Sequence, residues 1–136
     1  MNFSTSTVVG AGLPTLRIKG KLLLPLVQGG MGVGVSAHRL SGSVARAGAV
    51  GTLSSVDLRR HHPDLMAQTA RSRDKELINR VNLIAIDREV RAALDIAAGN
   101  GLVAVNIMRA VSEYAANVRQ SCESGAQAIV VRSEEH

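Results

Sequence analysis

Aromatic side chains are almost missing from this sequence: Phe3 and Tyr114 are the only two, and there is no tryptophan. Sites that bind single-stranded nucleic acids stack the bases on aromatic rings. The net charge of +5 comes from lysines and arginines that are scattered along the chain, whereas a nucleic-acid interface gathers them on one face. We therefore expect no nucleic-acid partner, and we assign the charge to solvated helix surfaces.

The scarcity of aromatic residues also means that any core is aliphatic. Hydrophobic residues make up 46% of the 136 residues, and Val, Ile, Leu and Ala occur in short runs. Such runs are typical of parallel α/β proteins, because their strands are covered on both faces. The length suits one domain, so the composition predicts a single α/β domain.

Cysteines and long apolar segments are equally scarce. Cys122 is the only cysteine, which excludes a disulfide framework and a thiolate metal cluster; its helical spacing from Val118 predicts a small core residue. His61 and His62 are adjacent and lack metal-ligand spacing, so we expect a solvated loop there and no metal site. No apolar run has the length of a membrane span, and residues 1–7 do not resemble a signal peptide. We expect a cytoplasmic protein without a membrane partner.

The order of predicted elements alternates strand and helix, which predicts right-handed crossovers and a parallel sheet. Proline and glycine positions and hydrophobic periodicity mark the boundaries. In chain order, we expect a loose lead-in over residues 1–13, a short hairpin around Lys19–Lys21, a first main strand from Pro25, a helix over 36–47 and a strand over 49–54. A long helical stretch follows, which carries Val90, Ala93, Leu94 and Ala97 and ends at 99–101, and then a strand over 102–106. The last elements are a helix with the stripe Val111, Ala115, Val118 and Cys122, a strand over 128–131 and a tail over 132–136.

The stretch Pro25–Gly34 is an apolar strand that runs into a glycine-rich turn. Leu26 and Val27 suit a buried parallel strand, and the four glycines of the turn remove Cβ atoms that would keep a flat or phosphorylated ligand from the backbone. Ser36 is placed to cap the next helix, whose positive dipole end would face the same ligand. The pattern predicts a cofactor cradle; a plain strand-to-helix turn is the alternative.

Two architectures fit this pattern. Gly32, Gly34 and Ala37 have the spacing G-x-G-x-x-A, and Asp57 follows the second main strand, as in a dinucleotide-binding fold; however, the first fingerprint glycine lies too far from Val27. In a (β/α)8 barrel, ligand-binding groups lie at the carboxyl ends of successive strands. Those ends carry residues 28–32, 52–55 and Asn106, whose amide both donates and accepts hydrogen bonds. For Asn106, capping of the following helix is the alternative.

At these residues the chain resembles a known family. The segments Pro-Leu-Val-Gln-Gly-Gly-Met-Gly (25–32), Ser-Ala-His-Arg-Leu (36–40), Gly-Thr-Leu-Ser-Ser-Val-Asp (51–57) and Val-Ala-Val-Asn-Ile-Met (103–108) look like the N-terminal half of a nitronate monooxygenase, formerly called 2-nitropropane dioxygenase. The resemblance extends from about Leu13 to Val131. This family and the related flavin-dependent enoyl-acyl carrier protein reductases are FMN-binding barrels.

The resemblance implies an FMN-dependent oxidoreductase that oxidises alkyl nitronates with oxygen. The Gly30-Met31-Gly32 backbone would lie against the flavin ring, Thr52 would stand near it, and Asn106 would form a hydrogen bond with it. The implied cofactor-binding residues are Gln28, Gly29, Gly30, Met31, Gly32, Thr52 and Asn106.

The chain departs from that family in its length. A (β/α)8 barrel takes about 250 residues, and only four main strands are expected here, so we predict the N-terminal half of a truncated FMN-binding barrel that is inactive alone. The catalytic histidine of the family is expected in the missing half; no histidine of this chain matches it, and His38 is expected at the surface or in packing. Open sheet edges predict self-association. A non-catalytic truncated product, a flavin-dependent enoyl-acyl carrier protein reductase and a piece of a dinucleotide-binding dehydrogenase remain as alternatives.

Overall fold

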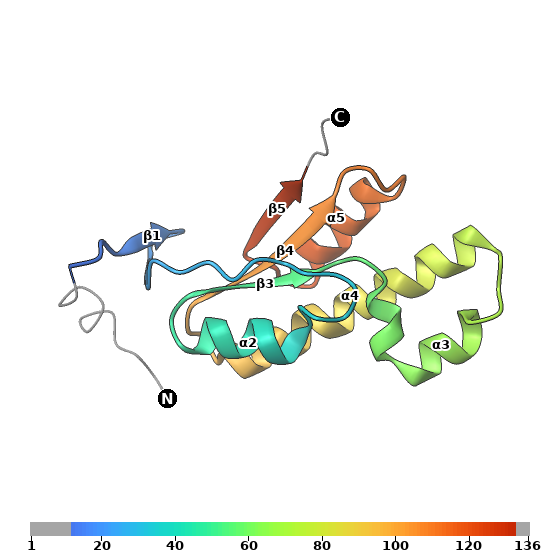
Figure 1. The fold of residues 1–136 in the computed structure, drawn as a ribbon, viewed down its shortest axis with the longest axis horizontal. Helices are drawn as coiled ribbons and strands as arrows, with labels where there is room; N and C mark the ends of the chain where they lie inside the picture. The colour runs from blue at the N-terminus through green and yellow to red at the C-terminus, as the bar shows by residue number, and fades with distance from the viewer. Residues whose placement is uncertain (1–11, 133–136) are drawn as a thin grey trace.

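The computed structural model describes residues 12–132 and has a mixed α/β fold with a three-stranded parallel sheet (Figure 1). The predicted lead-in and tail therefore lie almost entirely outside the described residues. In chain order the elements are β1 (Leu16–Ile18), β2 (Lys21–Leu23), α2 (His38–Arg46), β3 (Val50–Ser54), the 3-10 helix η1 (Leu58–His61), α3 (Pro63–Thr69), α4 (Lys75–Ala97), β4 (Leu102–Met108), α5 (Tyr114–Glu123) and β5 (Ala128–Arg132).

The main sheet has the order β3-β4-β5, and all three strands are parallel. Val50 is paired with Leu102 and Ser54 with Asn106. These strands confirm the three that were predicted after the glycine turn. Their short Val-, Ile- and Leu-rich runs suit positions that are covered on both faces.

The predicted first main strand is reduced to a single parallel bridge between Val27 and Val50. Gln28 N donates to Val50 O at 2.9 Å, and Val50 N donates to Leu26 O at 3.1 Å. The expectation that Leu26 and Val27 are buried is wrong: they are 58% and 61% exposed. Their segment is the outermost in the sheet, so no further described strand covers these side chains.

The predicted hairpin is confirmed and covers one face of the sheet. β1 and β2 pair antiparallel, and Leu23 packs with Val50, Leu102 and Ala104 in an aliphatic cluster. The Lys21 ammonium group donates to Gly99 O at 3.2 Å and to Gly101 O at 3.0 Å. The hairpin is thus attached to the end of the sheet where the strands begin.

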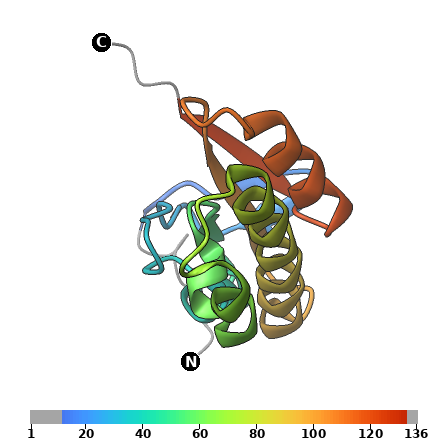
Figure 2. The same cartoon turned by 90° about the vertical axis from the view of Figure 1, so that its right-hand side faces the viewer.

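The helices cover the opposite face. Leu53, Val105 and Ile107 point into a larger aliphatic cluster with residues of α2 and α4, and α4 and α5 lie side by side (Figure 2). The helix predicted to end at 99–101 is confirmed as the end of α4, where Ala98 and Gly99 have φ values of +52° and +81°. No helix within residues 12–132 is both long enough and apolar enough to cross a membrane.

The N-terminus of α2 differs from the prediction. The helix starts at His38 and its N-cap residue is Ala37, so Ser36 does not cap it and forms other hydrogen bonds, described below. Its end is as expected, because Gly48 follows with a φ of +101°. The helix lies very close to β3: a Cβ at Gly51 would be 1.8 Å from Ser41 O.

The apolar stripe predicted for α5 is wrong at three positions, because Ala115 and Cys122 are exposed and Val111 precedes the helix, which begins at Tyr114. The buried residues of this helix are Asn117 and Ser121. Ser121 Oγ donates to Asn117 O at 2.7 Å, so its hydroxyl is satisfied within the helix. A serine can therefore replace an aliphatic residue on this face without stranding its hydroxyl.

Asp87 on α4 connects the two helices. Its pKa is lowered because Ser124 Oγ donates a hydrogen bond to Oδ1 at 2.7 Å and because Arg91 Nε lies 2.8 Å from the same oxygen. The folded state therefore binds this proton less readily than the unfolded state. The resulting stabilisation is present above about pH 4 and is lost as the pH falls through the folded-state pKa.

We expect Ser124→Ala to lower the free energy of unfolding by about 1 kcal/mol near pH 7, because a hydrogen bond to a charged group is lost at a partly screened site; the Asp87 side chain is 34% exposed. The difference from the wild type should shrink near pH 3. Urea unfolding at both pH values measures it, with the exposed Asp95→Asn as control. Equal wild-type and Ser124→Ala stabilities at both pH values would contradict this role.

Candidate functional site

The residues that the sequence predicted to bind a cofactor lie together at the carboxyl ends of the Val27 bridge, β3 and β4. Side chains alternate along a strand, and Val50 and Ala104 belong to the cluster on the hairpin face. Thr52 and Asn106, which are two residues further along their strands, share that face. The candidate site is therefore on the face opposite the helices, next to the glycine turn.

Gln28 acts as an extra rung at the edge of β3. Its Oε1 accepts from Thr52 N at 2.9 Å, and its Nε2 donates to Thr52 O at 3.1 Å and lies 3.1 Å from Ser36 Oγ. Both ends of the carboxamide are thus used inside the protein. This chain's own backbone accounts for a glutamine here, and a contact of Gln28 with a cofactor stays a prediction.

Ser36 closes the glycine turn instead of capping α2. It is completely buried; its Oγ accepts from Met31 N at 2.8 Å, and its N donates to Met31 O at 3.0 Å. Its carbonyl also accepts from Ser54 N at 3.0 Å. The turn is therefore fastened to β3 through one serine, a role that local capping rules do not predict.

Three glycines of the turn face side chains of this chain: Gly30, Gly34 and Gly32, where a Cβ would lie 3.2 Å from Ser54 Oγ. A Cβ at Gly30 would lie 2.7 Å from Asn106 Cβ, and one at Gly34, where φ is +79°, would lie 2.8 Å from His61 Nε2. Gly29 differs, because a Cβ there would meet nothing within 4 Å. Internal packing is thus a sufficient reason for glycine at positions 30 and 34, and the predicted contact with a ligand remains open.

Asn106 and Thr52 each hold a buried oxygen atom without a hydrogen-bond partner among the described residues. These atoms are Asn106 Oδ1 and Thr52 Oγ1, whereas Asn106 Nδ2 donates to Gly30 O at 3.3 Å. Asn106 lies inside β4, and α5 begins only at Tyr114, so its alternative role as a helix cap is wrong. An unpartnered buried polar group costs about 1–3 kcal/mol, which favours a bound partner at this place.

Asp57, the acid of the dinucleotide-binding alternative, is already paired. Its two carboxylate oxygens lie 3.2 Å from Arg59 Nε and from Arg60 Nε. A ribose hydroxyl would have to compete with two guanidinium groups. This arrangement does not favour the dinucleotide-binding alternative.

Sequence reasoning missed a buried carboxylate on the other side of α2. Glu89 of α4 is 1% exposed. Its Oε2 accepts from the backbone N of His38 at 2.8 Å and lies 2.7 Å from His38 Nδ1; its Oε1 lies 3.0 Å from His62 Nε2, an electrostatic contact without hydrogen-bond geometry. The sequence did contain a signal for this buried carboxylate, because Glu89 directly precedes Val90 and so lies on the apolar side of α4.

The same cluster corrects the prediction for the adjacent histidines. His62 is the N-cap residue of α3 and is mostly buried against Glu89, so it is not in a solvated loop; His61 is exposed and faces Gly34. His38 does take part in packing, as expected. Within residues 12–132, no group of three or more His, Cys, Asp or Glu side chains is placed to hold a metal ion.

Neither a comparison with models of known protein families nor a search of curated proteins finds a match to this sequence. A functional assignment therefore depends on the geometry of the residues themselves.

Proposed function

We propose that this chain is the N-terminal half of an FMN-dependent (β/α)8-barrel oxidoreductase of the nitronate monooxygenase kind. Its substrates would be alkyl nitronates and oxygen. The observation that carries the proposal is the meeting of the glycine turn with Thr52 and Asn106 at the carboxyl edge of a parallel sheet, where two buried oxygen atoms lack a partner in the described chain.

The strand order supports a barrel over a dinucleotide-binding fold. The Val27 bridge, β3, β4 and β5 are neighbours in the order in which they occur in the chain. In the dinucleotide-binding order 3-2-1-4, the fourth strand lies beside the first; here it lies beside the third. The helix α5, which connects the third and fourth strands, packs on the same face as α2 and α4, as in a barrel, whereas in a doubly wound sheet the second half carries its helices on the other face.

The residues of the site fit a flavin chemically. The Asn106 carboxamide oxygen accepts and the Thr52 hydroxyl can donate or accept, as polar ring edges require, and the exposed side chains of Met31, Val33 and Val35 offer apolar surface on the same turn. Both oxygen atoms are covered at present, so contact with a ligand requires the turn to shift. When bound, FMN would carry electrons from the nitronate to oxygen, and this chain would bind and orient it.

The described histidines do not supply a proton-accepting group at this place. His38 and His62 contact Glu89, and His61 faces Gly34. In the proposed barrel, the base and the phosphate-binding loops of the late strands would therefore come from the other half.

The open edge of the described sheet indicates the proposed partner. Val130 and Val131 of the edge strand β5 are about half exposed, and such an edge can pair with another chain. We propose that it pairs with the strands that complete the barrel, and that without them it pairs with further copies of this chain.

The test is co-expression of this chain with the C-terminal half of a nitronate monooxygenase, followed by spectroscopy of the flavin that is released on denaturation. We expect FMN in the co-expressed complex and little in the chain alone. In the complex, Asn106→Ala should weaken FMN binding about fivefold, since one buried polar contact contributes on the order of 1 kcal/mol.

Asn100→Ala is the matched control, because Asn100 lies in the exposed turn before β4. It should leave FMN binding unchanged. Bound NAD without flavin, no cofactor in either preparation, or equal FMN affinity of Asn106→Ala and the wild type would contradict the proposed function.

A further inference from the structure

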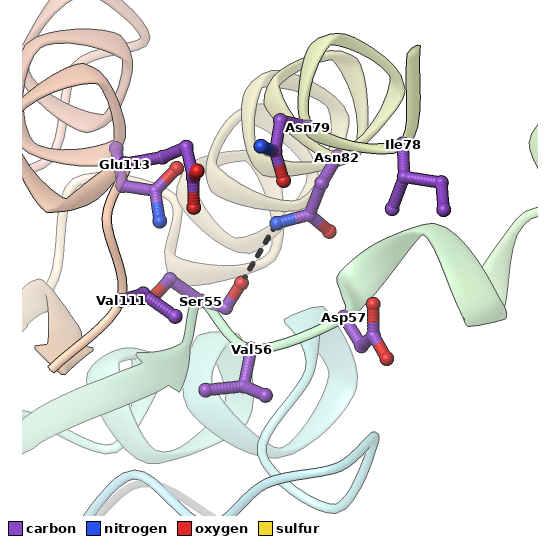
Figure 3. A pocket seen from close by; sticks show the side chains of 9 residues that line it. Ser55, Val56, Asp57, Ile78, Asn79, Asn82, Val111 and Glu113 are labelled. Carbon is purple, nitrogen blue, oxygen red and sulfur yellow. Dashed lines mark hydrogen bonds between the residues drawn. The ribbon is translucent and has the colours of Figure 1, made fainter. Parts of the chain in front are cut away.

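A second site lies at the same edge of the sheet, on the side of the helices. A cavity of about 230 Å³ opens between the loop after β3, the first turns of α4 and the loop before α5 (Figure 3). Figure 3 shows Asn79, Asn82 and Ile78 on one side of it, Glu113 and Val111 on the other, and Ser55 and Val56 below them. Ligand cavities commonly hold roughly 300–1,000 Å³, so this one suits a molecule of few atoms.

Two of the polar side chains in its wall already form hydrogen bonds or ion pairs within the protein. Asn82 Nδ2 donates to Ser55 O at 3.1 Å, and Asn82 Oδ1 accepts from Arg59 N at 3.2 Å. Asp57 is paired with Arg59 and Arg60. These two side chains shape the cavity and do not need a ligand.

Other polar groups in the wall are not occupied. Ser55 is 99% buried, and its Oγ has no partner among residues 12–132. The carboxamides of Asn79 and of the buried Asn117 form no hydrogen bond with another described side chain or backbone group. Glu113 accepts a hydrogen bond from Ser112 Oγ but forms no ion pair within the described part of the chain. The cavity therefore presents a Glu113 carboxylate without an ion pair among the described residues and the unused carboxamides of Asn79 and Asn117, whereas the Ser55 hydroxyl oxygen is covered behind its wall.

We infer that this cavity binds a small primary ammonium ion with a short alkyl chain. An ammonium group has three hydrogen-bond donors and no acceptor, which matches the Glu113 carboxylate together with the carboxamide oxygens of Asn79 and Asn117. Val56, Ile78 and Val111 provide apolar contacts for the alkyl part. An anion of the same size would face the Glu113 carboxylate without a compensating cation in the wall.

The cavity is separate from the proposed flavin site. Ser54 Oγ would lie 3.2 Å from a Cβ at Gly32, on the hairpin face of the sheet, whereas Ser55 is the next residue and lines the cavity. Ser55 N donates to the backbone carbonyl of Asn106 at 3.1 Å, while the Asn106 side chain reaches Gly30. Val56 borders both sites, because it lines the cavity and its Cβ would lie 3.5 Å from a Cβ at Gly32, but the groups that would hold the ammonium ion are not part of the flavin site.

The test uses n-butylammonium chloride and the full chain in saturation-transfer NMR titrations, with sodium butyrate as the anionic probe at equal ionic strength. This method observes the small molecule, so it also works when the protein associates. We expect saturable transfer to butylammonium and at least about tenfold weaker binding of butyrate, because the carboxylate strengthens hydrogen bonds from a cation and repels an anion.

Glu113→Gln should weaken butylammonium binding at least about tenfold, since the charge is lost while the shape is kept. Glu123→Gln removes the same charge at an exposed position near the end of α5 and should leave binding unchanged. Circular dichroism verifies that both variants are folded. Butyrate binding as tight as butylammonium binding, unchanged affinity of Glu113→Gln, or an equal loss in both variants would overturn the inference.

Discussion

Glu89→Ala is expected to lower the free energy of unfolding by about 3–5 kcal/mol, as measured by urea unfolding near pH 7. Glu89 Oε2 accepts the hydrogen bond of the first backbone N–H of α2, and the carboxylate lies between His38 and His62. The alanine variant would leave these donors buried without an acceptor and would also leave a cavity in the core. This combination makes Glu89 one of the two most sensitive positions that we identify.

Two further variants separate charge from shape. Glu89→Gln keeps one oxygen acceptor and nearly the same volume, so it should cost less than Glu89→Ala, about 1–3 kcal/mol. Asp95→Ala removes an exposed carboxylate from the same helix and should change stability by no more than about 0.5 kcal/mol. A loss below about 1 kcal/mol for Glu89→Ala would show that the carboxylate does not hold these helices together.

The Glu89 cluster also supports the candidate cofactor site indirectly. His38 lies four residues after Gly34, the last glycine of the turn. His61, which is next to His62, packs against Gly34. Glu89 thus contacts both segments that flank the turn. We expect a Glu89 variant that still folds to bind FMN less tightly in the completed barrel because the turn is less ordered.

Gly51→Ala is the second change with a large expected effect. A Cβ there would lie 1.8 Å from the carbonyl oxygen of Ser41, and backbone atoms cannot move aside as the end of a flexible side chain can. The helix α2 would have to shift away from β3, so we expect a loss of at least about 3 kcal/mol in the free energy of unfolding, at the upper end for overpacked sites.

Gly29→Ala is the matched control for this prediction. The added Cβ would meet no atom within 4 Å, so the stability should change by no more than about 0.5 kcal/mol. Thermal or urea unfolding of both variants gives the comparison. A Gly51→Ala protein within about 1 kcal/mol of the wild type would mean that α2 can move away from β3 at little cost.

Local sequence patterns predicted the elements well where the signal was periodic or where glycine ends an element. The runs 50–54, 102–106 and 128–131 are strands, and α4 ends at the Gly99 turn. Here neighbouring residues determine the structure, because glycine readily adopts the positive φ of a helix end, which at α4 Ala98 shares with Gly99, and aliphatic runs favour covered strands.

The same patterns gave wrong predictions where a side chain had several possible hydrogen-bond or packing partners. Ser36 has the residue type of a helix cap but bonds within the turn to Met31. Cys122 has the spacing of a core residue but is exposed, because the buried side of α5 carries Asn117 and Ser121. These outcomes depend on which neighbour lies within hydrogen-bond or contact distance, and spacing along the chain does not contain that information.

The sequence by itself determined an aliphatic, parallel α/β fold and a glycine-rich turn followed by polar residues at the strand ends, because both features depend on which residues are neighbours along the chain. Only the tertiary structure decided that Gly30 lies against Asn106, that Glu89 joins two histidines, and that Ser55 and Glu113 line one cavity. Each of these contacts joins residues far apart in the chain. They form because covering the hydrophobic faces of the sheet fixes how the helices and loops approach one another, and the polar side chains are then held wherever that packing places them.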